Sequence, residues 1–291
     1  MDLVDLHTHS TASDGSLTPT ELVEAAHRAG LRALALTDHD SVGGLEEAGA
    51  AAARLGIGFL GGVELSVSHA GGSVHMLGYG VDPADPAFSA RLADMQERRE
   101  RRNRLMLERF AALGIPMTEA DLVAAAGGAL PLANVGRPHF ARLLIERGAV
   151  ASFEEAFDRF LAKGKPAYVP KERVSPEEGI EAVHAGFGLA VLAHPIYAGT
   201  EGRQDLDRLV ERLAAAGLDG LECFYSDHSD ADTAHFLALA GRLGLLVTGG
   251  SDFHGPAARP DIRLGTGRGG LRVPYAHFER LRDELARRKR G

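Results

Sequence analysis

The hydrophobic pattern of the chain alternates between short apolar runs and longer amphipathic segments. Apolar runs centred near residues 3, 33, 59, 74, 190, 221 and 246 predict β-strands. Amphipathic segments predict helices at about 18–29, 44–55, 176–185, 206–216, 230–243 and 274–288. Strands that alternate with helices are typical of βα units in a mainly parallel sheet. The pattern therefore predicts an α/β body of seven βα-like units, irregular and barrel-like.

Between residues 86 and 166 the pattern is helical throughout. A long charged segment, Phe88–Leu113, precedes three shorter helical stretches at about 119–126, 138–147 and 153–161. We expect a small helical insertion domain over 86–166, carried by a body made of 1–85 and 167–291. The arginine-rich run 98–102 lies in the long helix and is interpreted as a solvated face paired with nearby acids, rather than a nucleic-acid contact.

Composition narrows the class of protein. The 291 residues are 45% hydrophobic and carry a formal net charge of −8, which argues against binding to duplex DNA. No apolar run approaches eighteen residues and no secretory signal is recognisable, so we expect no membrane contact. The single cysteine, Cys223, lies in an apolar strand pattern and is predicted to be a packing residue in a reducing, cytoplasmic protein. The oligomeric state is left open.

Histidines and carboxylates gather at the predicted strands and directly after them. His7 and His9 are two residues apart, so an extended backbone presents both imidazoles to the same side. The full set of candidates is His7, His9, Asp14, His39, Glu64, His75, His194, Asp252 and His254. Histidine and carboxylate suit Mn²⁺, Zn²⁺ or Fe²⁺, and the set is large enough for two or three ions. Such centres activate water for phosphoester hydrolysis, so that is the first chemistry to consider.

A second motif, Asn134–His139, lies in the helical insertion. Arg137 and His139 flank a proline at a predicted helix start, where backbone N–H groups also favour anions. A clamp for a substrate phosphate and a plain surface cap are both compatible with this pattern.

Together these residues resemble a known family. The motifs are Asp5-Leu6-His7-Thr8-His9-Ser10 with Asp14-Gly15, Thr37-Asp38-His39-Asp40, Gly62-Val63-Glu64, His75, Leu192-Ala193-His194-Pro195 and Gly250-Ser251-Asp252-Phe253-His254. In this order they resemble the PHP (polymerase and histidinol phosphatase) superfamily. The resemblance implies a distorted (βα)7, TIM-like barrel with a trinuclear metal centre at the strand ends.

The resemblance also implies a division of the metal ligands. One ion would be held by His7, His9, Glu64 and Asp252, and Glu64 would bridge to a second ion held with His75 and His194. Asp14, His39 and His254 would hold the third. Arg137 and His139 would bind the substrate phosphate, by similarity to the branch that includes nucleoside 3′,5′-bisphosphate phosphatases and a 5′→3′ exoribonuclease.

The expected function is therefore that of a divalent-metal-dependent phosphoesterase. Its substrates would be small nucleotides, such as nucleoside 3′,5′-bisphosphates and AMP-like compounds, or the 5′ ends of short RNA. The nucleophile would be a metal-bound water, with Mn²⁺ the first candidate ion and Zn²⁺ or Fe²⁺ the alternatives. Two other functions stay open: a histidinol-phosphate phosphatase, and a non-catalytic module that binds metal and nucleotide.

Overall fold

The computed structural model describes residues 2–69, 71–126, 132–170, 172 and 174–290. These residues form two compact units. The first contains Met1–Leu92 and Arg173–Gly291, and the second contains Ala93–Glu172. The sequence predicted the insertion at 86–166, so the observed division lies a few residues further along the chain at both ends.

The first unit is built on a seven-stranded sheet in which spatial order follows chain order. Its strands are β1 (Val4–Asp5), β2 (Ala33–Leu36), β3 (Gly58–His69), β4 (Gly72–Tyr79), β5 (Leu189–Leu192), β6 (Gly220–Tyr225) and β7 (Leu246–Gly250). Backbone hydrogen bonds join the last strand to the first: Leu6 N donates to Gly249 O and Asp252 N donates to His7 O. The predicted α/β barrel with seven strands is thus confirmed.

One strand differs from the predicted pattern. β4 pairs antiparallel with both β3 and β5, because β3 and β4 form a hairpin and no helix separates them. The chain therefore lacks a βα unit at this point. The antiparallel direction places the first half of β4 beside the last half of β3, with His75 opposite Ser66. This register brings a residue from the start of one strand to the carboxyl end of the barrel.

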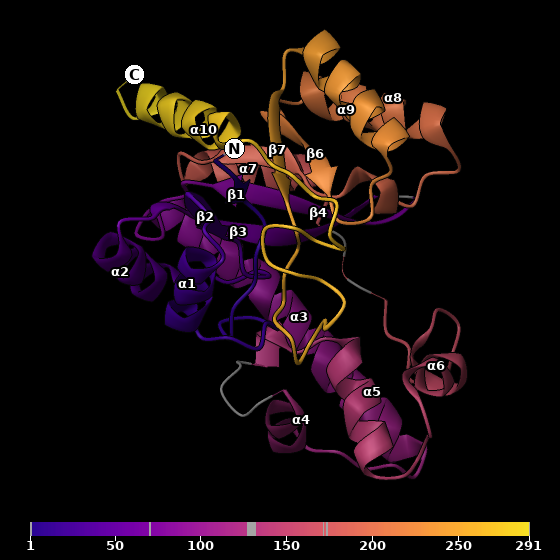
Figure 1. Ribbon diagram of the computed structural model, residues 1–291. Coiled ribbons are helices and arrows are strands. Elements are labelled where there is room, and N and C mark those ends of the chain that lie inside the picture. Colours follow the sequence, from indigo (N-terminus) through magenta and orange to yellow (C-terminus); the bar gives the residue numbers. More distant parts are fainter. Residues whose placement is uncertain (1, 70, 127–131, 171, 173, 291) are drawn as a thin grey trace. The chain divides into compact units, whose positions relative to one another are not determined.

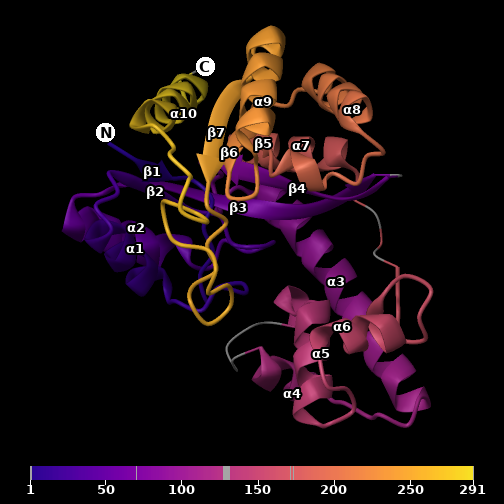
Figure 2. The ribbon, with the colours of Figure 1, turned by 45° about the vertical axis from the view of Figure 1, so that its right-hand side comes forward.

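Helices cover the barrel in the expected positions (Figures 1 and 2). They are α1 (Pro19–Arg28), α2 (Leu45–Leu55), α7 (Pro176–Ala185), α8 (Arg203–Ala215), α9 (Asp230–Leu243) and α10 (Tyr275–Arg288), with a short turn η3 (Pro195–Tyr197). A capping box starts α1: Glu21 N donates to Thr18 Oγ1, and Thr18 N donates to Glu21 Oε2. Both views show α1 and α2 beside β2 and β3, and α9 beside β6 and β7.

The last helix, α10, closes the amino end of the barrel. A Cβ on Gly58, the first residue of β3, would lie 2.9 Å from Cζ of Phe278. Leu281 and Leu285 of α10 are buried in the same apolar cluster as Val4 and Ala33. Side chains of α10 therefore fill the end of the barrel at which the parallel strands begin, and the opposite end is left for the histidines.

The second unit is helical. It contains most of α3 (Pro86–Ala112), then α4 (Glu119–Ala125), η1 (Leu132–Asn134), α5 (Arg137–Glu146), α6 (Phe153–Ala156) and η2 (Phe157–Leu161). Its core is aromatic: the ring of Phe110 lies 5.8 Å from that of Phe140 and 5.9 Å from that of Phe160. A separate apolar core explains why this segment forms a unit of its own.

The arginine-rich run on α3 was predicted to be a solvated face, and residues 98–101 are half-buried or exposed. Arg101 is exposed and pairs with Glu172, and Arg104 further along pairs with Glu100. Arg102 is the exception, because it is buried and donates from Nε to Val169 O. Among the described residues, no helix is long and apolar enough to span a membrane.

Candidate metal centre

The nine candidate histidines and carboxylates meet at the carboxyl end of the barrel. His7 and His9 follow β1, and their rings lie 5.3 Å apart on one side of the backbone, as the two-residue spacing predicts. His39 follows β2, His194 follows β5, and Asp252 and His254 follow β7. Glu64 and His75 lie inside β3 and β4 rather than at strand ends, because the hairpin extends beyond the barrel rim.

Glu64 is the centre of the cluster. Its Oε1 lies 2.9 Å from His75 Nδ1 and 3.1 Å from His194 Nε2. Its Oε2 faces three further imidazoles: the distances are 3.0 Å to His39 Nδ1, 3.2 Å to His9 Nε2 and 3.3 Å to His7 Nε2. One carboxylate thus faces five histidines, with its two oxygens turned to different groups of them.

Two other carboxylates complete the arrangement. Asp252 Oδ1 lies 3.1 Å from His9 Nε2 and 3.5 Å from His7 Nε2. Asp14 Oδ1 lies 3.3 Å from His254 Nε2, and the rings of His9 and His254 stack with centroids 4.1 Å apart. His9 therefore stands between the Glu64–Asp252 side and the Asp14–His254 side.

The donor atoms form three overlapping groups, in each of which all the donors lie within 4.8 Å of one another. The groups are His7, His9, Glu64 and Asp252; His9, Asp14, His39 and His254; and His39, Glu64 and His75. The first has the same members as one set implied by the family resemblance. The other two add His9 and His39 as shared residues, and His194 joins through its contact with Glu64.

Several buried nitrogen and oxygen atoms of the cluster have no hydrogen-bond partner, as expected of atoms that bind a cation. Within the described chain, buried atoms without a hydrogen-bond partner include His7 Nε2, both ring nitrogens of His9, His39 Nδ1 and Glu64 Oε2. Several of them are about 3 Å apart but are not aligned as donor and acceptor. A buried polar atom without a partner is costly, whereas atoms that converge on a common point can share an ion. The donor set therefore fits divalent metal ions.

The electrostatics indicate the same demand for positive charge. Burial opposes ionisation of Glu64, but the surrounding histidines outweigh it and hold the pKa of Glu64 well below its usual value. Burial also lowers the pKa of His39 and His254, yet the carboxylates raise those pKa values to about 9 and about 10. The pKa of His75 falls to about 4, because burial dominates there. These shifts show that the cluster favours ionised carboxylates next to positive charge, which metal ions supply when they bind.

Supporting residues fix the orientation of the candidate ligands. Glu222 is fully buried in β6; its Oε1 lies 3.0 Å from His7 Nδ1, and its Oε2 accepts from His194 N. His254 Nδ1 lies 2.9 Å from Asp252 O, a contact that leaves Nε2 directed at Asp14. Partners of this kind select the imidazole tautomer and aim the free nitrogen at a metal.

Two supporting carboxylates were not predicted from the sequence. Besides Glu222, Asp38 is buried and accepts from Ser10 N, Ser10 Oγ and Ser13 Oγ, which holds the loop before Asp14. Glu222 stands alone among apolar neighbours in Gly220–Tyr225. A lone acid in a buried strand is the sequence feature that indicates such a role.

The backbone is strained at two of the candidate ligands. His194 has φ 25° and Asp252 has φ 57°, values that residues other than glycine rarely adopt. Such strain persists where surrounding contacts over-determine the position, and it is concentrated at functional sites. Asp252 is held by Tyr225, whose hydroxyl donates to Oδ2 at 2.9 Å, and by Arg259 Nη1 at 3.3 Å from the same oxygen.

Arg137 and His139 lie in the second unit, at the start of α5. The guanidinium of Arg137 lies over the rings of Phe157 and Tyr168, 5.5 and 6.0 Å from their centroids. It also contributes to lowering the pKa of the buried Arg102 to about 10, after the larger effect of burial. His139 is buried and its Nδ1 accepts from Gly136 N, so the imidazole caps the helix.

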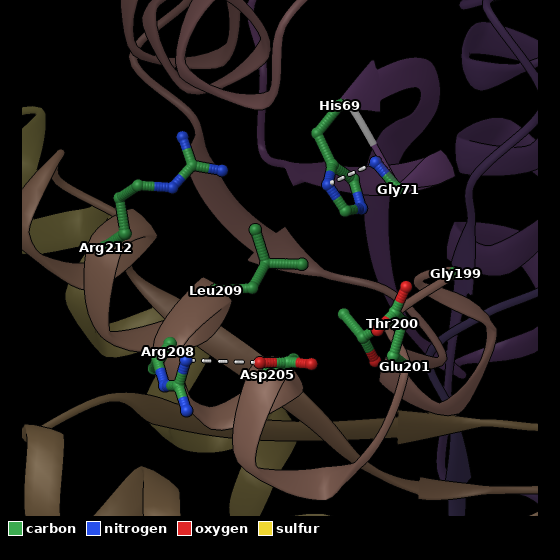
Figure 3. A pocket seen from close by; sticks show the side chains of 9 residues that line it. All are labelled: His69, Gly71, Gly199, Thr200, Glu201, Asp205, Arg208, Leu209 and Arg212. Atoms are coloured by element: carbon green, nitrogen blue, oxygen red, sulfur yellow. Dashed lines mark hydrogen bonds and ion pairs between the residues drawn. The ribbon is translucent and has the colours of Figure 1, made fainter.

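A separate pocket lies beside the hairpin tip (Figure 3). It is lined by His69, Gly71, Gly199, Thr200, Glu201, Asp205, Arg208, Leu209 and Arg212, none of which belongs to the metal centre. Its arginines are paired, Arg208 with Asp205 and Arg212 with Glu177.

Cys223 is buried in β6 with its thiol pKa raised by burial, which confirms its role as a packing residue.

A barrel that ends in three overlapping histidine–carboxylate groups defines a class, the metal-dependent barrel hydrolases. The model of the PHP domain matches residues 5–131. Together with the relatives described next, this match shows that the chain belongs to the PHP family.

Three similar proteins illustrate the match. A 3′,5′-nucleoside bisphosphate phosphatase from Chromobacterium violaceum is 43% identical over 262 residues, 87% of either chain. A 5′-3′ exoribonuclease from Haemophilus influenzae is 37% identical over 254 residues, covering 87% of this chain and 90% of the relative. A solved structure from Bifidobacterium adolescentis, described as a metal-dependent phosphoesterase, has a TM-score of 0.82 at 32% identity and covers 96% of this chain and 95% of its own.

Proposed function

We propose that the chain is a divalent-metal-dependent phosphoesterase that hydrolyses nucleoside 3′,5′-bisphosphates, AMP-like nucleotides and the 5′ ends of short RNA. The observation that carries the proposal is the Glu64-centred cluster, in which Glu64 Oε2 and ring nitrogens of His7, His9 and His39 converge without a hydrogen-bond partner. The relatives named for nucleotide and RNA substrates support this choice of substrates.

Two to three metal ions fill the centre in this proposal. His7, His9, Glu64 and Asp252 would hold one ion, Asp14, His39 and His254 would hold another, and Glu64, His75 and His194 would hold a third. Mn²⁺ is the first candidate, with Zn²⁺ and Fe²⁺ as alternatives, since histidine–carboxylate donor sets accept all three. When bound, such ions supply positive charge and a water molecule whose pKa is lowered toward neutrality.

The residues of the chain then have distinct tasks. Glu222 keeps the Nδ1 side of His7 occupied, so that Nε2 faces the centre. Tyr225 and Arg259 engage Oδ2 of Asp252 and leave Oδ1 turned toward His9. Arg137 binds the substrate phosphate, because a guanidinium grips two phosphate oxygens at once. His139 holds the start of α5 through Nδ1, which accepts from Gly136 N, and it would bind the same phosphate from its place two residues after Arg137.

Phosphate release separates this function from its alternatives. The protein is stripped of metal, reloaded with Mn²⁺ and assayed side by side with a nucleoside 3′,5′-bisphosphate and histidinol phosphate. We expect the nucleotide to be hydrolysed with the higher kcat/KM. Faster release from histidinol phosphate would identify the other phosphatase, and tight nucleotide binding without turnover would identify a binding module.

The expectations about binding partners and cellular location stay predictions. Neither duplex DNA nor a membrane is a partner in this proposal, and the protein acts in the cytoplasm on small substrates.

A further inference from the structure

An exposed aromatic ring lies beside the metal centre. Tyr197 is 53% exposed and belongs to η3, which begins directly after His194. Its ring centroid lies 5.8 Å from that of His194, and its backbone N–H donates to His194 O. The ring therefore stands next to the residue through which β5 reaches the metal centre.

The ring is held in place from several sides. Its hydroxyl donates to Asp227 Oδ2 at 2.8 Å, and Asp227 Oδ1 accepts from Arg268 Nε. Tyr225 packs against it edge to face, with centroids 6.1 Å apart and planes at 87°. Tyr225 also donates to Asp252, so the two tyrosines form a continuous wall that starts at the metal centre.

The loop after Tyr197 is braced as well. His69 Nε2 lies 2.6 Å from Ala198 O, which ties the hairpin tip to this loop. Gly199 has φ +68°, and a Cβ there would lie 2.6 Å from Gly71 O, so the close approach requires glycine. Figure 3 shows the hairpin residues His69 and Gly71 on one side and the loop residues Gly199, Thr200 and Glu201 on the other. An exposed ring fixed this firmly costs little entropy when a ligand stacks on it.

We propose that Tyr197 is the platform on which the nucleobase of the substrate stacks while its phosphate occupies the metal centre. The inference rests on the proposed function and names the residue that favours nucleotides over base-free phosphoesters. Tyrosine rings stack on any base, because every base has a π-face. The platform therefore selects for the presence of a base and not for its identity.

The test compares two substrates that differ only in the base. These are 2′-deoxyadenosine 3′,5′-bisphosphate and the bisphosphate of 1,2-dideoxyribose, measured with the Mn²⁺-loaded enzyme. We expect the kcat/KM ratio of the two to fall by roughly 5- to 100-fold in Tyr197→Ala, mainly through KM of the nucleotide. Where turnover of the base-free compound is slow, its inhibition constant gives the same comparison.

Two further variants separate stacking from a structural effect. Tyr197→Phe keeps the ring and loses the bond to Asp227, so it is expected to retain most of the base preference. Phe187→Ala removes another exposed aromatic ring, 53% exposed, from the opposite end of β5 and is expected to leave the ratio unchanged.

Two results would overturn the assignment. An equal loss of kcat/KM on both substrates in Tyr197→Ala would show a structural role, and wild-type kcat/KM on both substrates would show that the base is bound elsewhere. Failure of the proposed function looks different, because wild-type protein with metal bound would then release phosphate from neither compound.

Discussion

At the scale of single residues, the orientation of His7 depends on Glu222. The carboxylate accepts from His7 on one oxygen and from the backbone N–H of His194 on the other. Both residues are buried, and water cannot replace either bond. Glutamine has the same shape but only one acceptor oxygen, so its amide NH₂ would face one of the two donors.

Glu222→Gln should therefore weaken metal binding, although Glu222 is not itself a candidate ligand and acts through His7. We expect apparent affinity for Mn²⁺ to fall about 10- to 100-fold, as for other partners of metal-bound histidines. Isothermal titration of the metal-free protein measures the change. Glu279→Gln on the exposed face of α10 is the matched control. Wild-type affinity in Glu222→Gln would show that His7 needs no such partner.

The sequence pattern predicted which side chains meet in the metal centre, but not which residues orient them through hydrogen bonds. His7 and His9 could be placed together because their two-residue spacing fixes a common side in an extended chain. Glu222 lies in an apolar strand pattern, and this local pattern does not reveal that its carboxylate faces a histidine 215 positions away. Such long-range pairs depend on how the barrel closes, which spacing along the chain does not encode.

At the scale of elements, the strand and helix positions were largely predictable, and the direction of β4 was not. An alternating pattern over 73–79 indicates a strand whichever way it runs. The missing helix between β3 and β4 indicates an antiparallel pair, because a parallel connection needs a crossover of about a dozen residues or more. The hairpin explains how His75, near the start of its strand, reaches the same rim as residues that follow other strands.

In the helical unit, the testable residue is Arg137 at the start of α5. Arg137 lies half-buried against Phe157 and Tyr168, near the buried Arg102, in the first turn of a helix whose first turn contains no acid. Arg137→Ala should lower kcat/KM for a nucleoside 3′,5′-bisphosphate roughly 10- to 100-fold, the effect of a lost charge-assisted contact to phosphate. Steady-state kinetics and metal analysis of the same samples check this.

Arg142, on the same helix, provides the control. Arg142 Nη1 donates to Ala125 O, and Arg137 Nη1 donates to Leu161 O. Both variants therefore remove an arginine–carbonyl contact within the unit. We expect kcat/KM of Arg142→Ala to stay within about twofold of wild type. If Arg137→Ala lost metal instead of substrate affinity, the assignment of Arg137 to the phosphate would be wrong.

At the scale of the whole molecule, the two ends of the barrel differ: one is closed by apolar contacts and the other contains the candidate metal ligands. The side chains of α10 close the amino end with apolar contacts, and the carboxyl end collects histidines and carboxylates from six of the seven strands or the segments that follow them. Parallel strands place their active groups at this end in other α/β barrels as well. The sequence predicted the gathering of ligands at the carboxyl end, because every candidate ligand could be assigned to a strand or a strand end. It did not predict that α10 closes the amino end.

The central claim is that this cluster holds the metal ions that make the protein a phosphoesterase. Its most direct test is phosphate release from a nucleoside 3′,5′-bisphosphate as Mn²⁺ is added to metal-free protein, for wild type and for Asp252→Asn, with bound metal measured in the same samples. We predict that wild-type activity rises with bound metal from near zero, and that Asp252→Asn, folded by circular dichroism, stays at least about 100-fold below it. Full activity of the metal-free protein, or wild-type rates in metal-loaded Asp252→Asn, would contradict the claim.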